Sequence, residues 1–231
     1  MGKKLKVAII PARGGSKRIP RKNIADFCGH PMISYSINAA IHSGIFDMII
    51  VSTDDPEIRK ISIHYGAEVP FIRPESLSDD FTPTLPVIHH AIEMIEKDAS
   101  SLNEICCIYP CSPLLLSEDL IKSYDAMTLG KQNSCIPVCR FQSAPQRAFF
   151  MDETKRLKWA EPEFKSTRTQ DLQTMFHDVG SFYWATKEKW LSGDISNGTG
   201  YEIPAWRVAD IDDMHDWKRA EILYRSTKVE V

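Results

Sequence analysis

The sequence lacks the cysteine and histidine spacings that build disulfide frameworks or zinc sites. Its six cysteines form no Cys-x-x-Cys pair, and its seven histidines contain no pair spaced for zinc. A chain of 231 residues buries roughly 70% of its unfolded surface on folding, so it needs no such staple. We therefore interpret the cysteines as reduced thiols in the core or in loops.

Long apolar runs are missing as well. No stretch approaches the ~20 residues of a membrane helix, and the apolar run at 5–10 is too short for a signal peptide. The net charge of −3 gives no overall field that would attract nucleic acid. We expect a cytoplasmic protein with no membrane or nucleic-acid partner.

Acidic residues are absent before Asp26, whereas that stretch holds eight cations. Lys3, Lys4 and Lys6 are interpreted as a polar tail that leads into a strand. The other five lie among glycine and proline, where they indicate an anion site. These five are Arg13, Lys17, Arg18, Arg21 and Lys22.

Apolar runs alternate with segments of helical pattern over the first 140 residues. This alternation predicts an α/β fold with a Rossmann-like, mostly parallel sheet and helices on both faces. The expected strands are 5–10, 46–53, 68–72, 104–109, 134–139, 180–185 and 206–211. The expected helices are 32–43, 55–66, 83–97, 117–130 and 213–225.

The pattern breaks between residues 141 and 177, where the sequence is polar and has little periodicity. A structureless loop of this length is uncommon inside a compact domain. We predict a nucleotide-binding α/β domain formed by 1–140 and 178–231, with 141–177 inserted as an arm for dimerisation and sugar binding.

The loop after the first expected strand carries the strongest functional signal. Pro11-Ala12-Arg13-Gly14-Gly15-Ser16-Lys17 lies between a strand and a helix, at the strand edge where open α/β sheets bind ligands. Its glycines permit close backbone approach to phosphate, and its cations supply charge. The spacing matches neither a Walker loop nor a dinucleotide fingerprint. The alternative is a solvated basic turn.

Two aspartates near the C-terminus are candidate metal ligands. Asp210 and Asp212 are two residues apart on an expected strand, which points both side chains to one face. Mg2+ is usually bound by one or two carboxylates together with substrate phosphates. The residues alone leave helix capping by Asp212 or Asp213 equally open.

The loop resembles the signature of the CMP-sialic acid synthetases, also called acylneuraminate cytidylyltransferases. The resemblance extends to 52–55 (STDD), 73–77 (RPESL), 112–114 (SPL) and 209–212 (ADID). Residues 17–23, 167–172 and 177–184 look most like the members that act on pseudaminic acid.

This resemblance implies transfer of CMP from CTP to a nonulosonic acid, with Mg2+ and with pyrophosphate release, for bacterial surface or flagellin glycans. It assigns catalysis to Arg13, Lys17, Asp210 and Asp212, the last two as metal ligands in preference to capping. The implied nucleotide-binding residues are Ala12, Arg13, Gly14, Gly15, Ser16, Lys17, Lys22, Asn23, Arg73, Thr82 and Thr84.

The resemblance also implies a sugar site and a homodimer whose arms contact sugar, often in the partner subunit. The implied sugar-binding residues are Tyr109, Ser112, Arg147, Arg168, Gln170, His177 and Asp178. Tyr109 stands where the sialic acid members usually have glutamine, which favours a less hydroxylated sugar. An acceptor such as legionaminic or N-acetylneuraminic acid, another sugar nucleotidyltransferase, and a non-catalytic nucleotide-binding module remain alternatives. Surface charge is the other reading of the two arginines.

Overall fold

A seven-stranded mixed sheet forms the centre of the computed structural model, which describes residues 5–97 and 101–227. Lys3 and Lys4 of the expected tail lie outside these residues. The main path runs in the order β11-β6-β10-β5-β1-β4, and β9 pairs with β6. The strands are β1 (Leu5–Pro11), β4 (Met48–Ser52), β5 (Leu102–Ile108), β6 (Ser134–Arg140), β9 (Phe176–Asp178), β10 (Phe182–Thr186) and β11 (Thr199–Glu202).

The α/β class is confirmed, but the prediction of a mostly parallel sheet is wrong. β4, β1 and β5 are parallel, whereas β10 runs antiparallel to both of its neighbours, β5 and β6. The chain leaves the sheet through β6 and returns through β9 and β10 without a crossover helix. Antiparallel strands allow such direct returns, whereas parallel strands need a crossover of a dozen or more residues.

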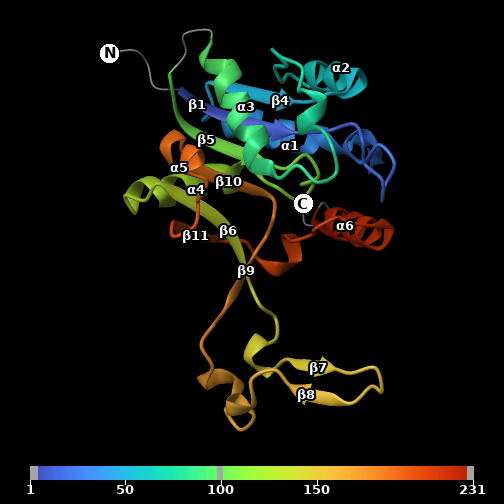
Figure 1. The fold of residues 1–231 in the computed structure, drawn as a ribbon, viewed down its shortest axis with the longest axis vertical. Coiled ribbons are helices and arrows are strands. Elements are labelled where there is room, and N and C mark those ends of the chain that lie inside the picture. Colours follow the sequence, from blue (N-terminus) through green and yellow to red (C-terminus); the bar gives the residue numbers. More distant parts are fainter. Residues whose placement is uncertain (1–4, 98–100, 228–231) are drawn as a thin grey trace.

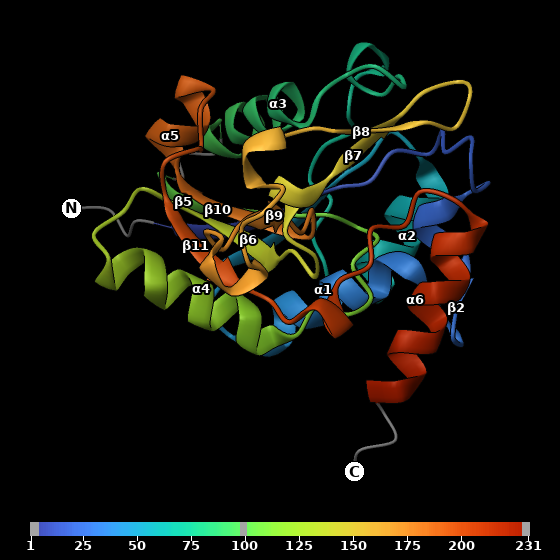
Figure 2. The same cartoon turned by 90° about the horizontal axis from the view of Figure 1, so that it is seen from below.

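The helices cover both faces of the sheet, as Figure 2 shows. The helices are α1 (Met32–Ser43), α2 (Pro56–His64), α3 (Thr84–Glu96), α4 (Ser117–Leu129), α5 (Lys187–Ser192) and α6 (Met214–Thr227). The side chains of β1 alternate between the two faces of the sheet. Ala8 and Ile10 pack in the core with α1, α2 and α4, while Val7 and Ile9 pack with α3 and α5. None of the described helices is long and apolar enough to cross a membrane.

The segment between β6 and β9 extends away from the sheet along the longest axis of the molecule (Figure 1). β6 and β9 pair antiparallel at its base, with Cys139 opposite His177. Its outer part holds a hairpin of β7 (Phe149–Met151) and β8 (Leu157–Trp159), which the sequence pattern did not predict. Asp152 accepts hydrogen bonds from the backbone N–H groups of Thr154 and Arg156 and so closes the turn.

Two expected strands do not form. In 68–72 a single bridge joins Glu68 to Ile50, because Pro70 interrupts the run and proline has no N–H to donate to a ladder. The segment 206–211 begins as a 3-10 turn, Ala205–Arg207, and continues as irregular chain. The side chain of Arg207 binds Asp119 of α4, with Nη1–Oδ2 2.6 Å and Nη2–Oδ1 2.9 Å, and this pair holds the turn in place.

The strand β11 and the short helix α5 were not predicted. Glycine is depleted in strands, and β11 is preceded by Gly198 and contains Gly200. Gly198 approaches β6 so closely that an added Cβ would lie 2.3 Å from the carbonyl oxygen of Ser134. The glycines that made a strand hard to predict here therefore allow β11 to pair with β6.

The last helix, α6, packs on a separate small core formed around Phe27. Trp217 lies with its ring centroid 5.3 Å from that of Phe27, in an edge-to-face arrangement. The Asp213 side chain accepts hydrogen bonds from the N–H groups of His215 and Asp216 and caps the helix. α6 thereby fixes the C-terminal end of the segment that carries Asp210 and Asp212.

Candidate active site

A cavity of about 640 Å3 opens at the carboxyl ends of β1 and β5. This is the edge at which open α/β sheets bind ligands. Most of the predicted nucleotide and metal residues line it. These are Arg13, Ser16, Lys17, Lys22, Asn23, Arg73, Thr82, Thr84, Asp210 and Asp212, together with Tyr109 from the predicted sugar set.

The glycines of the loop lie beside the cavity rather than in its lining. A Cβ on Gly14 would meet the Asp55 carboxylate at 2.7 Å, so only glycine fits there. The N–H of Gly14 donates to Asp54 Oδ1 at 3.1 Å, so this N–H group is not free to bind phosphate. Ala12 is buried and belongs to the core, with its N–H bonded to Ser52 O at 2.9 Å.

Two loop cations converge on one carboxylate. Arg13 Nη1 lies 2.6 Å from Asp80 Oδ1, and Lys17 forms an ion pair with the other oxygen of the same carboxylate. The bonds from Lys17 and Arg13 hold the pKa of Asp80 below its usual value. Sequence reasoning missed Asp80, although it follows the arginine motif at 73–77 by only a few residues. Asp80 places a negative charge where the loop would receive phosphate.

The remaining loop cations take three different directions. Arg21 binds Asp55, with Nη1–Oδ2 2.5 Å and Nη2–Oδ1 3.0 Å, and so stabilises the loop. Contrary to expectation, Arg21 does not line the cavity. Arg18 forms an ion pair with Asp212 at 2.8 Å, and Lys22 Nζ donates to Ile211 O at 2.6 Å. These two contacts join the loop to the segment that holds the aspartates.

Asn23 holds the loop in shape. Its Nδ2 donates to Arg13 O at 2.9 Å, and its Oδ1 accepts from Cys111 Sγ at 3.2 Å. Burial raises the pKa of the Cys111 thiol to about 12, which keeps it protonated as a donor. Asn23 is buried at the cavity wall and sets the position of the Arg13 backbone.

Arg73 is a buried cation in the lining of the cavity. Its Nε donates to Ser52 Oγ at 3.1 Å and its Nη2 donates to Ser52 O. Burial lowers its pKa to about 10, although the charge of Asp54 acts in the other direction. Among the described residues no carboxylate pairs with Arg73 directly, so an anion or a carbonyl of a ligand would compensate it.

Asp210 and Asp212 face the same cavity from an irregular segment rather than from the strand predicted for them. Burial and the charge of Asp212 raise the pKa of Asp210, while the charge of Lys22 lowers it. Among the described residues, Asp210 has no hydrogen-bond or ion-pair partner. Its carboxylate therefore lacks a cation directly bound to it.

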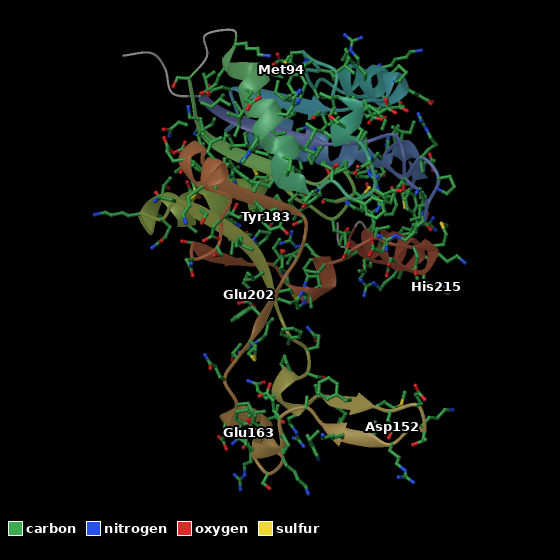
Figure 3. The ribbon with its side chains drawn as sticks, viewed as in Figure 1. Met94, Asp152, Glu163, Tyr183, Glu202 and His215 are labelled. Atoms are coloured by element: carbon green, nitrogen blue, oxygen red, sulfur yellow. The ribbon has the colours of Figure 1, made fainter. Side chains whose placement is uncertain are left out.

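A pair of tyrosines forms the wall between β5 and β10. The hydroxyl of Tyr109 lies 2.8 Å from Thr84 Oγ1, and its ring meets that of Tyr183 edge to face. Tyr183, labelled in the body of the molecule in Figure 3, donates to Asp178 Oδ2 at 2.5 Å. The N–H of Gly180 donates to the other oxygen at 2.9 Å, so the Asp178 carboxylate has a fixed position.

A second cavity of about 410 Å3 lies at the base of the arm. Gly180 and Asp210 line both cavities, which therefore meet at these two residues. The predicted sugar residues His177 and Asp178 line the second cavity, as does Arg219 of α6, which is not among the residues predicted from the sequence. Ser112 lines a narrower crevice that also reaches Asp210.

Three predicted sugar residues lie on the arm and line none of these cavities of their own chain: Arg147, Arg168 and Gln170. Arg147 Nη1 lies 3.3 Å from Thr169 Oγ1, and Arg168 precedes the 3-10 turn Thr169–Asp171 that contains Gln170. Figure 3 shows the arm, marked by Asp152 and Glu163, far from Tyr183. The described chain does not bring these three residues together with the rest of the site.

The sequence of the chain is similar to the sequences of known proteins. Residues 7–158 match the family described as cytidylyltransferase. A pseudaminic acid cytidylyltransferase of Campylobacter jejuni subsp. jejuni serotype O:2 is 39% identical over 222 residues, which cover 95% of this chain and 96% of that protein. A CMP-N,N'-diacetyllegionaminic acid synthase of Legionella pneumophila subsp. pneumophila is 38% identical over 235 residues, covering 94% and 95%.

The fold has a counterpart among solved structures. A CMP:2-keto-3-deoxy-manno-octonic acid synthetase complexed with CTP superposes with a TM-score of 0.70 and 15% identity, covering 97% of this chain and 100% of that one. The two proteins therefore share an architecture.

Proposed function

Because the chain belongs to the cytidylyltransferase family, we propose that it transfers CMP from CTP to the anomeric hydroxyl of pseudaminic acid, a nonulosonic acid. The observation that supports this most is the cavity, whose lining brings the loop cations and two aspartates together. Cations would bind a triphosphate there, and the carboxylates would face its reacting phosphate. The second cavity gives the acceptor a place beside it.

Arg13 and Lys17 are proposed to bind the triphosphate in place of Asp80. Asp80 occupies both cations through single charge-assisted contacts, and all three side chains are partly exposed. A triphosphate carries more negative charge than one carboxylate, so it competes favourably for the pair. Arg73, Thr82 and Thr84, which line the same cavity, are proposed to hold the ribose and cytosine.

The side chains of Asp210 and Asp212 fit Mg2+. Two carboxylates facing one cavity, of which Asp210 has its pKa raised by burial and by its neighbour, are a suitable donor set. Among the described residues no cluster of three or more metal-binding side chains exists, so phosphate oxygens would complete the coordination. When bound, the ion would neutralise charge on the triphosphate. Arg18 and Lys22 hold the segment that carries both aspartates.

The proposed reaction forms one bond and breaks another at the α-phosphorus. The anomeric hydroxyl loses its proton to water and its oxygen bonds to the α-phosphorus, while the bond between the α-phosphorus and the pyrophosphate oxygen breaks and pyrophosphate leaves. Arg13 and Lys17 would stabilise the charge that accumulates on the departing pyrophosphate. Fixing CTP and sugar in adjoining cavities supplies the orientation on which such transfers depend.

The arm is proposed to join two copies of the chain. Its hairpin exposes large apolar side chains, with Phe150 68% and Met151 66% exposed, together with Leu157 and Phe149. Exposed apolar side chains grouped in this way mark interaction surfaces. In a dimer, Arg147, Arg168 and Gln170 would reach the sugar of the partner subunit. The use of CTP fits the cytoplasmic location expected from the sequence.

Pyrophosphate release with CTP and a panel of acceptors tests this function. The panel contains pseudaminic, legionaminic, N-acetylneuraminic and 2-keto-3-deoxyoctonic acids and a sugar 1-phosphate. We expect the highest kcat/KM with pseudaminic acid. A preference for legionaminic acid would move the assignment to that acceptor, and turnover only with the sugar phosphate would refute a nonulosonic acid as substrate.

A further inference from the structure

The second cavity contains a cation that nothing in the chain uses. Arg219 lies on α6, is exposed, and lines the cavity at the base of the arm. Within the described residues, every other basic side chain in the two large cavities has a hydrogen-bond or ion-pair partner, whereas Arg219 has none. The partners are Asp80 for Arg13 and Lys17, Asp212 for Arg18, Ile211 O for Lys22, Ser52 for Arg73, Thr174 for Arg140, and Asp178 O for His177.

The helix itself explains why Arg219 is free. Trp217 and Ala220 are buried in the small core, which turns Arg219 to the other side of α6. The neighbouring acid one turn earlier is Asp216, and its Oδ2 already accepts the N–H groups of Asp212 and Asp213 at 3.1 and 3.3 Å. Arg219 therefore lines the cavity without a carboxylate partner from its own helix.

The acceptor has a chemical constraint that applies to this cavity. In a nonulosonic acid, the anomeric hydroxyl and the carboxylate are attached to the same carbon. If the hydroxyl lies at the junction marked by Asp210 and Gly180, the carboxylate lies beside the junction too. The cations of the first cavity are those proposed to hold CTP and the aspartate segment. A free arginine on the acceptor side meets the need for a bidentate carboxylate partner.

We propose that Arg219 binds the carboxylate of the acceptor in the second cavity and so restricts the enzyme to α-keto acid sugars. This inference rests on the proposed function and adds a specificity-determining residue to it. The lining of the cavity also offers Asp178, fixed by Tyr183 and Gly180, as an acceptor for N–H or O–H groups of the sugar. The cavity thus presents one free cation and one fixed carboxylate to a molecule that carries a carboxylate and amides. Its volume of about 410 Å3 is within the range of small-molecule sites.

Steady-state kinetics of Arg219→Met with pseudaminic acid and with its methyl ester test this role. Lost charge-assisted bonds should raise the KM for the acid by about 10- to 100-fold, with the KM for CTP changed less than about twofold. The wild type should prefer the acid to the ester, and the variant should lose most of this preference. Arg219→Lys should recover part of the loss, because it keeps the charge without the bidentate geometry.

Lys218→Met is the matched control, since Lys218 is exposed on the same helix and lines neither large cavity. It should leave both KM values unchanged. Calorimetric binding of CTP to each variant checks that the fold and the nucleotide site are intact.

An acid KM within about twofold of the wild type in Arg219→Met would overturn the inference, as would retention of the preference for the acid over the ester. A rise in acid KM in Arg147→Met alone would transfer the role to the arm. The wild-type reaction reports separately on the proposed function. If the wild type shows no turnover, calorimetric binding of pseudaminic acid to wild type and Arg219→Met still decides whether Arg219 holds the acid.

Discussion

The central sheet with its helices, here called the body, differs from the arm (residues 141–177) in whether the functional residues of one chain reach a cavity of that same chain. In the body, the loop after β1, Arg73, Tyr109 and the 209–212 segment all reach one cavity of the same chain. On the arm, Arg147 and Arg168 reach no cavity of their own chain, and the hairpin exposes large apolar side chains. One copy therefore contains the whole cavity that is proposed to bind the nucleotide, whereas the proposed role of the arm requires a second surface.

Removing a charge from the body should have the largest effect. Lys17→Ala and Asp210→Ala are each expected to lower kcat at least ~100-fold, which is the scale of losing one preorganised charge contact in a transition state. Pyrophosphate release with CTP and pseudaminic acid measures this. Lys122→Ala is the control, because its exposed pair with Glu118 lies on α4, away from the cavity. Turnover close to wild type in both well-folded variants would refute the loop and aspartate assignments.

The stability of the body should depend on the buried ion pair between Arg207 and Asp119. Arg207 and Asp119 have side chains only 11% and 2% exposed. Arg207→Met leaves the Asp119 charge buried, although Tyr201 and the Leu116 N–H still bond to it. We expect a loss of about 2 kcal/mol in the free energy of unfolding by urea, below the 3–5 kcal/mol typical of fully orphaned buried charges. An unchanged urea midpoint would show that this pair does not stabilise the body.

The arm should respond in the opposite way, with altered association and unaltered folding. Phe150→Asp places a charge on the exposed face of the hairpin and should raise the dimer dissociation constant at least ~10-fold. The urea midpoint of the body should be unchanged. Light scattering over a concentration series measures the dissociation constant, with Glu153→Ala in the hairpin turn as the control. A wild type that is monomeric at micromolar concentration would rule out the dimer.

The smallest expected effect is a change in CTP affinity when Asp80, which forms ion pairs with the loop cations, is replaced. Asp80→Asn removes a competitor for Arg13 and Lys17 and should tighten CTP binding about fivefold, as expected for partly exposed charge pairs. Calorimetry at fixed ionic strength measures this. Glu75→Gln, in the same connection between α2 and α3, is the control. Weaker binding of CTP to Asp80→Asn would instead show that Asp80 supports the bound nucleotide.

Sequence predicts the body where local chemistry decides the structure. The apolar run of β1, and the loop that follows, can be located from residue type and spacing alone. Asp55 caps α2 as its position before Pro56 indicates, through bonds to the N–H groups of Glu57 and Ile58. The position of β1 and the cations of its loop therefore follow from residues that are neighbours in the chain.

Sequence fails where the outcome depends on distant partners. The direction of β10 depends on how the chain returns from the arm. β11 is missed because glycine is untypical of strands, whereas Gly198 is needed here for the close approach to Ser134. The pairing of Asp80 with two cations 63 and 67 positions earlier is equally invisible in local pattern. Arg219 was missed for a related reason, since an exposed arginine on a helix becomes informative only when its neighbours are known.

The most direct test of the proposed function measures products rather than binding. Wild-type protein is incubated with CTP, Mg2+ and pseudaminic acid, and pyrophosphate is quantified together with the CMP-linked sugar by mass spectrometry. We predict equal amounts of the two products, with neither formed when the sugar is omitted or when Asp210→Ala replaces the wild type. Binding of CTP without release of pyrophosphate, with any acid of the panel, would contradict the assignment and leave only a nucleotide-binding module.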